Sequence, residues 1–185
     1  MNIALFGGVF NPPHIGHLLI AQQVLDFAGV DEVWFMPNYG QQPPKEGVAL
    51  VEHRLAMTKL LELPKTRVST LEIDHRLDGN TINLLPHLPK EHTYTFIIGS
   101  DQLPAFVQWD RWEELVETME FLVFPRLGHP VSPLVKNMNV LGHEFLITTD
   151  ISSTKIRARV AAGLSIDGFV SPQIAAYIRV HGLYT

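Results

Sequence analysis

The sequence contains no cysteine among its 185 residues, which excludes disulfide bonds, thiol nucleophiles and thiolate metal sites. Its apolar runs are all far shorter than the about 18 residues of a membrane-spanning helix, and the N-terminus lacks the basic leader of a secreted protein. The formal net charge of -5 argues against broad electrostatic binding to nucleic acid or to an anionic membrane. We therefore expect a cytoplasmic protein whose partners include neither nucleic acid nor membranes.

Positive charge is also missing from residues 1–44, and Lys45 is the first cationic side chain. An anion bound by this region must therefore be held by backbone amides and histidine. We expect Lys45 to supply a cation from a Pro-rich loop that closes over the site. The alternative is that Lys45 is an ordinary solvated charge.

Short β-rich apolar runs alternate with helical patterns along the whole chain. This alternation predicts an α/β fold, a Rossmann-like doubly wound parallel sheet with helices on both faces. The length fits a single domain over residues 1–185, with a small C-terminal helical part at about 150–185. The predicted strands are 2–6, 32–36, 67–73, 94–98, 120–124 and 145–148. The predicted helices are 16–28, 50–63, 81–88, 109–117, 152–162 and 172–181.

The segment LFGGVFNPPHIGHLLIAQQV joins the first strand to the first helix. Gly7 and Gly8 allow a ligand to approach the backbone, and the free N–H groups and dipole of the following helix favour a phosphate. His14 and His17 flank Gly16 and add two donors. The dinucleotide and Walker A fingerprints are not matched, and no third metal ligand lies nearby in sequence. We interpret this turn as a nucleotide phosphate site; a plain strand-to-helix connection is the alternative.

A second helix start lies in DISSTKIRARVAAG, residues 150–163. Ser152 or Ser153 is a suitable N-cap, and Arg157 lies one turn inside the helix, from where it can reach back over the capped end. The predicted strand 145–148 would place this end on the same sheet edge as the histidine turn, which suits a polyphosphate. The alternative is a capped helix with a solvated arginine.

A third turn, IIGSDQLPAFVQWDRW, also follows a predicted strand. Gly99 permits close approach of a ligand, and Asp101 could accept hydrogen bonds from ribose hydroxyls. Trp109 and Trp112 are three residues apart on a predicted helical turn. We expect Trp112 in the core and Trp109 stacked on a ligand ring, although aromatic residues at this spacing are often both core residues.

GGVFNPPHIGH together with ISSTKIR resembles the signatures of a nucleotidyltransferase superfamily, a His/Thr-x-Gly-His turn and an Ile-Ser-Ser-Thr-x-Ile-Arg helix start. Within it, the chain is similar over nearly its whole length to the bacterial nicotinate mononucleotide adenylyltransferases, through GSD, PPK and the ending VSPQIAAYIRVHGLY. The resemblance implies NAD biosynthesis by transfer of an adenylyl group from ATP to nicotinate mononucleotide, which yields nicotinate adenine dinucleotide and pyrophosphate. It implies Mg²⁺ held mainly by the ATP phosphates, with no protein metal ligands, and a homo-oligomer is left open.

The resemblance also implies residue roles. Catalysis would fall to His14, His17 and Arg157. The residues binding ATP would be Gly7, Gly8, Phe10, His17, Gly99, Asp101, Ile151, Ser152, Ser153 and Arg157. The residues binding the pyridine mononucleotide would be Asn11, Lys45, Thr81 and Trp109.

The chain departs from the family pattern at three places. Val9 stands where Ser or Thr is common, and Asn11 where Asp is common; in DGNTINLL only Thr81 matches the usual Ser-Tyr-Thr run. The choice between nicotinate and nicotinamide therefore stays open, as does a phosphopantetheine adenylyltransferase, although that family commonly has Thr in place of His14. A nucleotide-binding regulatory module without turnover is the alternative from another class.

Overall fold

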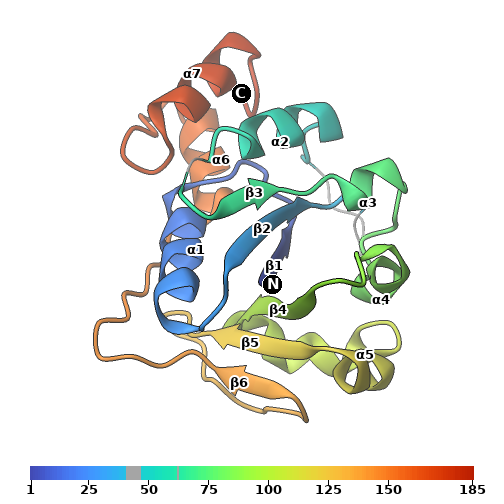
Figure 1. Ribbon diagram of the computed structural model, residues 1–185. Helices are drawn as coiled ribbons and strands as arrows, with labels where there is room; N and C mark the ends of the chain where they lie inside the picture. The colour runs from blue at the N-terminus through green and yellow to red at the C-terminus, as the bar shows by residue number, and fades with distance from the viewer. Residues whose placement is uncertain (41–46, 62) are drawn as a thin grey trace.

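The computed structural model describes residues 1–40, 47–61 and 63–185. Its centre is a six-stranded sheet, entirely parallel, in the order β3-β2-β1-β4-β5-β6 (Figure 1). The sheet confirms the doubly wound α/β fold expected from the sequence. The strands are β1 (Asn2–Gly8), β2 (Glu32–Pro37), β3 (Thr66–Val68), β4 (Thr93–Gly99), β5 (Glu120–Phe124) and β6 (Met138–Val140).

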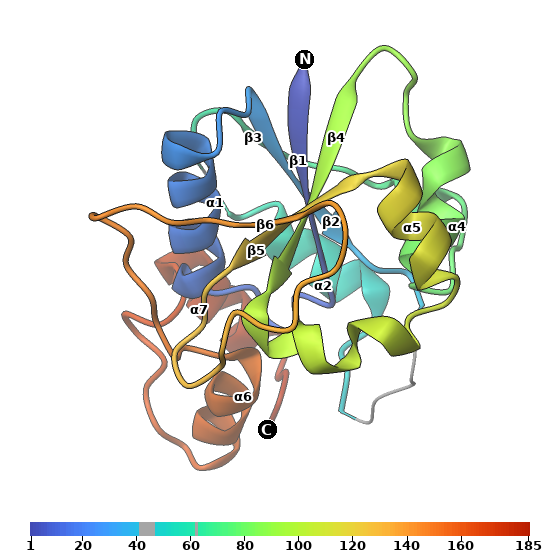
Figure 2. The same cartoon turned by 90° about the horizontal axis from the view of Figure 1, so that it is seen from below.

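Helices cover both faces of the sheet, with α1 on one side and α5 on the other (Figure 2). In the described part of the chain, no helix is long and apolar enough to cross a membrane. The α-helices are α1 (Ile15–Phe27), α2 (Val51–Thr58), α3 (Leu71–Asp74), α4 (Thr81–Leu84), α5 (Trp112–Thr118), α6 (Ser153–Ala161) and α7 (Pro172–Val180). Two 3-10 helices, η1 (Leu85–His87) and η2 (Ser100–Gln108), complete the set.

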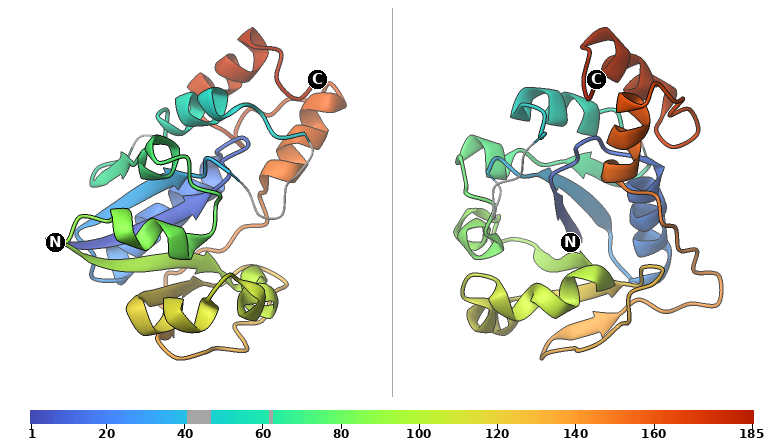
Figure 3. Two further views of the ribbon diagram at one scale, coloured as in Figure 1. Left: turned by 90° about the vertical axis from the view of Figure 1, so that its right-hand side faces the viewer. Right: turned by 180° about the vertical axis from the view of Figure 1, so that it is seen from behind.

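The core consists of two apolar clusters, one on each face of the sheet. Along β1, Ala4 belongs to one cluster, and Ile3 and Leu5 belong to the other, because successive strand side chains point to opposite faces. Since both faces are buried, the strands read as continuous apolar runs rather than alternating ones. The two C-terminal helices pack on the cluster that contains Ala4, through Ile156 of α6 and Ile174 of α7, on the side away from α4 and α5 (Figure 3).

The winding of the sheet reverses between β1 and β4. From β1 the chain builds outward through β2 and β3, and from β4 it builds the other way through β5 and β6. In open parallel sheets, ligands bind in the crevice outside the carboxyl ends of the strands at this reversal. In this chain those ends are Gly8 and Gly99.

Several predicted elements differ from the structure. The helix expected at 50–63 ends at Thr58, and the helix expected at 81–88 divides into α4 and the 3-10 helix η1. The strand expected at 67–73 stops at Val68 and gives way to the short helix α3, and the helix expected at 109–117 begins only at Trp112. The strand expected at 145–148 does not form. Its backbone at Ile147 instead exchanges hydrogen bonds with the side chain of Gln23 on α1, and Ile147 is 61% exposed. The sixth strand is β6, in a segment where no strand or helix was predicted.

Candidate functional site

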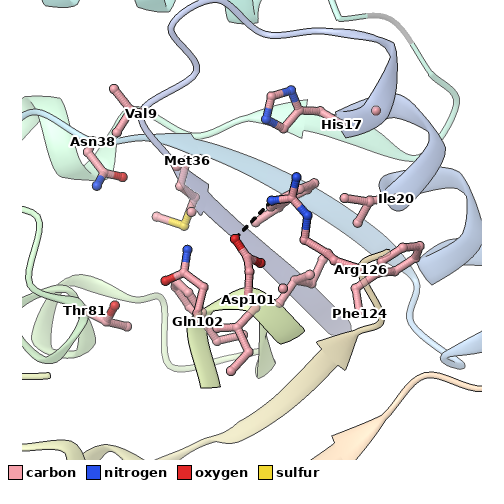
Figure 4. Close-up of a pocket in the computed structure, with 18 of the residues that line it drawn as sticks. Val9, His17, Ile20, Met36, Asn38, Thr81, Asp101, Gln102, Phe124 and Arg126 are labelled. Atoms are coloured by element: carbon pink, nitrogen blue, oxygen red, sulfur yellow. Dashed lines mark hydrogen bonds and ion pairs between the residues drawn. The ribbon is translucent and has the colours of Figure 1, made fainter. Parts of the chain in front are cut away.

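A cavity of about 700 Å³ opens at the carboxyl ends of β1 and β4, within the usual range for small-molecule sites (Figure 4). It gathers most of the residues that the sequence singled out, from turns far apart in the chain. The predicted residues that line it are Gly7, Gly8, His14, His17, Thr81, Gly99, Asp101, Trp109, Ile151, Ser152 and Ser153.

The glycines that end β1 lie at the cavity, but their φ angles are not positive; Phe10 has the positive φ instead, at 49°. A Cβ on Gly7 would lie 2.7 Å from Cζ of Phe96, and one on Gly8 would lie 3.3 Å from the ring of Phe10. The absence of side chains therefore makes room for packed aromatic rings as well as exposing backbone to the cavity. Phe10 is itself buried in the core and does not line the cavity.

The two histidines lie ring against ring at the start of α1, with their planes tilted by 31°. Their ring centroids are 3.8 Å apart, and the backbone N–H of His14 donates to Nδ1 of His17 at 3.0 Å. Gly16 makes this arrangement possible, because a Cβ at that position would lie 2.9 Å from Nδ1 of His14. The spacing His-x-Gly-His is thus a packing requirement.

Both imidazoles are neutral. Burial, and to a smaller extent the charge of Arg126, lower the pKa of His14 to about 3. Burial, His14 and Arg126 also hold the pKa of His17 well below its usual range. Since Nδ1 of His17 accepts a hydrogen bond, the proton of its neutral ring lies on Nε2, and that group is a donor. Nδ1 of His14 is buried without a hydrogen-bond partner.

Arg126 is a residue of the site that our sequence analysis missed. It lies directly beyond β5, where its Nη1 is 3.2 Å from Oδ2 of Asp101 and its backbone N–H donates to Ser100 Oγ at 2.9 Å (Figure 4). Among the described residues that line the cavity, it is the only lysine or arginine. Its position in the sequence could have indicated a site residue, because a residue just after a parallel strand lies on the same sheet edge as the glycine turns.

Gly99 makes room for this ion pair. A Cβ at Gly99 would overlap Oδ1 of Asp101 and lie 2.8 Å from Cδ of Arg126. Oδ1 of Asp101 is buried without a hydrogen-bond partner, whereas Oδ2 pairs with Arg126. Oδ1 of the Asp101 carboxylate is therefore left without a partner in the described residues and is covered by the backbone at Gly99.

The start of α6 does reach the cavity, although the strand expected to feed it is absent. Ser152 caps the helix by accepting from the N–H of Lys155, and Ser153 Oγ donates to the carbonyl of Pro12 at 2.8 Å. Arg157 Nη1 donates to the carbonyl of Asn11 at 2.8 Å. These bonds fasten α6 to the histidine turn, and Arg157 itself stays outside the cavity lining.

Asn11 is buried and is committed to the fold. Its Oδ1 accepts from the N–H of Ala49 at 3.0 Å and from the hydroxyl of Tyr184 at 2.7 Å, and its Nδ2 donates to the carbonyl of Gly47. Asn11 does not line the cavity. The expected role of Lys45 falls outside the described residues.

Two of the four residues expected to bind the acceptor, Thr81 and Trp109, line the cavity. Thr81, the first residue of α4, lies across the cavity from His17 (Figure 4). Trp109 lines the cavity and packs against Phe106 with ring centroids 5.0 Å apart. Trp112 also packs against Phe106, with ring centroids 6.4 Å apart, and does not line the cavity. Both tryptophans are partly buried against the same apolar cluster, and the stacking of Trp109 on a ligand ring stays a prediction.

Comparisons with known proteins show what this chain is similar to. The model of the cytidylyltransferase-like family matches residues 5–159. A "Probable nicotinate-nucleotide adenylyltransferase" of Salinibacter ruber is 38% identical, covering 100% of this chain and 98% of the relative; one of Caldicellulosiruptor saccharolyticus is 37% identical, covering 100% and 99%. A solved Plasmodium falciparum nicotinic acid mononucleotide adenylyltransferase complexed with NaAD has a TM-score of 0.79 at 20% identity, covering 99% of this chain and 97% of that one, and supports the fold. The chain belongs to the cytidylyltransferase-like family.

Proposed function

We propose that this protein transfers the adenylyl group of ATP to nicotinate mononucleotide, which yields nicotinate adenine dinucleotide and pyrophosphate in NAD biosynthesis. The observation that carries the proposal is the convergence of the neutral His14–His17 pair, Arg126 and the start of α6 on one cavity. Relatives that align with the whole chain bear the name of this activity. The cavity also has an aromatic and polar end, at Trp109 and Thr81, for an acceptor ring.

The reaction is an in-line displacement at the α-phosphorus. A phosphate oxygen of the acceptor forms the new P–O bond as the bond to pyrophosphate breaks. That oxygen is already largely ionised at pH 7, so no general base is required. Catalysis then consists of positioning the two substrates and stabilising the charge that spreads over the phosphate oxygens.

The histidine turn and the neighbouring side chains of the cavity supply that stabilisation. Nε2–H of His17 donates to an α-phosphate oxygen, and as a neutral donor it needs no proton from solvent. Arg126 adds positive charge at the same place, and the carboxylate of Asp101, which lines the cavity, accepts from the ribose of ATP. His14 orients His17 and contacts the phosphates from beside it.

Pyrophosphate leaves toward the start of α6. The Ser152 and Ser153 end of this helix presents free N–H groups and the positive end of the helix dipole. Arg157 holds the adjoining turn by donating to the carbonyl of Asn11, and in the proposed reaction it exchanges that carbonyl for a phosphate oxygen. This assignment keeps the expected role of Arg157 while giving it a second, structural one.

We infer that Mg²⁺ accompanies the triphosphate. In residues 1–40, 47–61 and 63–185, no three His, Asp or Glu side chains gather to form a metal site. An ion held by phosphate oxygens and water, as Mg²⁺ often is beside nucleotides, needs no such cluster of protein ligands. When bound, the ion offsets the negative charge of the triphosphate.

Pyrophosphate release tests the proposal. The protein is mixed with ATP and Mg²⁺ and, in separate reactions, with nicotinate mononucleotide, nicotinamide mononucleotide or phosphopantetheine. We expect the fastest release with nicotinate mononucleotide. Faster release with another acceptor would reassign the substrate, and no release with any of the three would favour a regulatory nucleotide-binding module.

A further inference from the structure

A buried carboxyl group that the reaction does not explain lines the same cavity. Glu72 lies on α3 and is only 5% exposed, and its Oε2 is buried without a hydrogen-bond partner. α3 follows β3, on the opposite side of the β1–β4 reversal from Arg126, which follows β5. Glu72 therefore belongs to the acceptor end of the cavity, with Thr81, rather than to the phosphate end.

An unpaired carboxylate at this position is costly in free energy. Burial, and then the charge of Asp78, raise the pKa of Glu72 to about 7, so that the group keeps its proton in slightly acidic solution. Asp78 is itself held by hydrogen bonds from Asn80 and Asn83. The other titratable or charged side chains lining the cavity are His14, His17, Asp101, Asp110 and Arg126.

The geometry of the proposed reaction places the acceptor ring near Glu72. The phosphate of the mononucleotide must lie by His17, so its ribose and pyridine extend toward Thr81 and Trp109. The ring carries one polar substituent, which is a carboxylate in nicotinate and a carboxamide in nicotinamide. A protonated Glu72 can donate to the carboxylate or to the carboxamide oxygen, and the bond to the charged carboxylate is the stronger one. An ionised Glu72 repels the carboxylate and can accept only from the carboxamide.

We propose that Glu72, with its proton in place, donates a hydrogen bond to the pyridine carboxylate of the acceptor and so determines the preference for nicotinate over nicotinamide. The inference deepens the proposed function and rests on it. A carboxyl group that served only the fold would be hydrogen-bonded within it, yet no described residue pairs with Oε2. A ligand at this end of the cavity would supply the missing partner.

The test compares both acceptors in the wild type and in Glu72→Gln. Values of kcat/KM, and dissociation constants from calorimetry, are measured for nicotinate and nicotinamide mononucleotides from pH 6 to pH 9. In the wild type the nicotinate-to-nicotinamide ratio should fall about tenfold per pH unit once Glu72 loses its proton. Glutamine donates an N–H at every pH, so its ratio should not follow pH. Asp74→Asn, which changes an exposed carboxyl on the same helix, should behave as the wild type.

The outcomes of these measurements either support or overturn the role proposed for Glu72. An equal loss for both acceptors in Glu72→Gln, or the same pH dependence as the wild type, would overturn the proposal. The wild-type profile alone gives a second test if the variant fails to fold, since a ratio independent of pH would also overturn it. If the wild type turns over neither acceptor but its binding ratio follows pH, the proposed function fails while the role of Glu72 stands. Binding of neither acceptor would overturn both.

Discussion

The backbone N–H of His14 donates to Nδ1 of His17, while the two rings lie with centroids 3.8 Å apart. This contact sets the tautomer of His17, because a nitrogen that accepts cannot carry the proton. The donor of His17 is therefore Nε2–H at all pH values where the ring is neutral. Neutrality follows from burial, so the site has a fixed donor rather than a pH-sensitive one.

Replacing His17 by Ala should lower kcat by about 10²- to 10³-fold, as expected when a donor to the transition-state charge is removed. The fold should persist, which circular dichroism would check beside the pyrophosphate assay. His181→Ala, which changes an exposed histidine outside the cavity, is the matched control and should keep wild-type activity. A His17→Ala protein within a few-fold of wild type would refute the role given to His17.

Gly16→Ala should impair catalysis without adding a polar group or a charge. The new Cβ would lie 2.9 Å from Nδ1 of His14, so the His14 ring must move and its contact with the ring of His17 must change. We expect kcat to fall about tenfold or more, since small displacements of catalytic groups are costly. Gly142→Ala is the control, because a Cβ there meets nothing within 4 Å. Equal activity of the two variants would contradict this account of the motif.

Arg126→Ala should reduce kcat/KM for ATP by about 10- to 100-fold, because the cavity loses a charge-assisted donor for phosphate. Arg126→Lys should recover part of the loss, since it restores the charge but not the planar donor geometry. Titration of ATP in the pyrophosphate assay measures both. Arg179→Ala, at a side chain 73% exposed, should leave the kinetics unchanged. A wild-type KM for ATP in Arg126→Ala would remove Arg126 from the proposed site.

The fold was largely predictable from the sequence because each strand is a short apolar run between turn residues. The failure at 145–148 has a specific cause. That stretch has the composition of a strand, but the side chain of Gln23 takes up the backbone hydrogen bonds of Ile147. A contact between residues 124 positions apart leaves no trace in the local pattern.

The site was predictable where a motif brings its own geometry, and less so where partners are distant. The His14–His17 pair lies within one turn and was recognised. The hydrogen bond from Arg157 to Asn11 joins residues 146 positions apart. The role of both residues in holding α6 against the histidine turn could therefore not be predicted from the sequence. Arg126 stands alone after its strand, without a motif around it, and Glu72 shows its importance only through burial.

Stability should depend on pH through the same buried groups. The pKa of His14 falls from 6.5 to about 3 on folding, and that of His17 is also lowered, so both contribute stability that is full above pH 6.5 and is lost as the pH falls. The pKa of Glu72 rises from 4.5 to about 7 on folding. The stability that its bound proton contributes is therefore lost as the pH rises from 4.5 to about 7. Between pH 5 and 6 the unfolded chain therefore binds one more proton than the native one at these sites, which corresponds to about 1.4 kcal/mol per pH unit.

Glu72→Gln removes the opposing group, so its free energy of unfolding should fall more steeply than that of the wild type on acidification. The difference between the two slopes should be about 1.4 kcal/mol per pH unit between pH 5 and 6. Urea denaturation at pH 5, 5.5 and 6 measures both slopes, with Asp74→Asn expected to parallel the wild type. A Glu72→Gln slope equal to or shallower than that of the wild type would mean that the native protein does not hold a proton on Glu72. The hydrogen bond proposed to the pyridine carboxylate would then lack its donor.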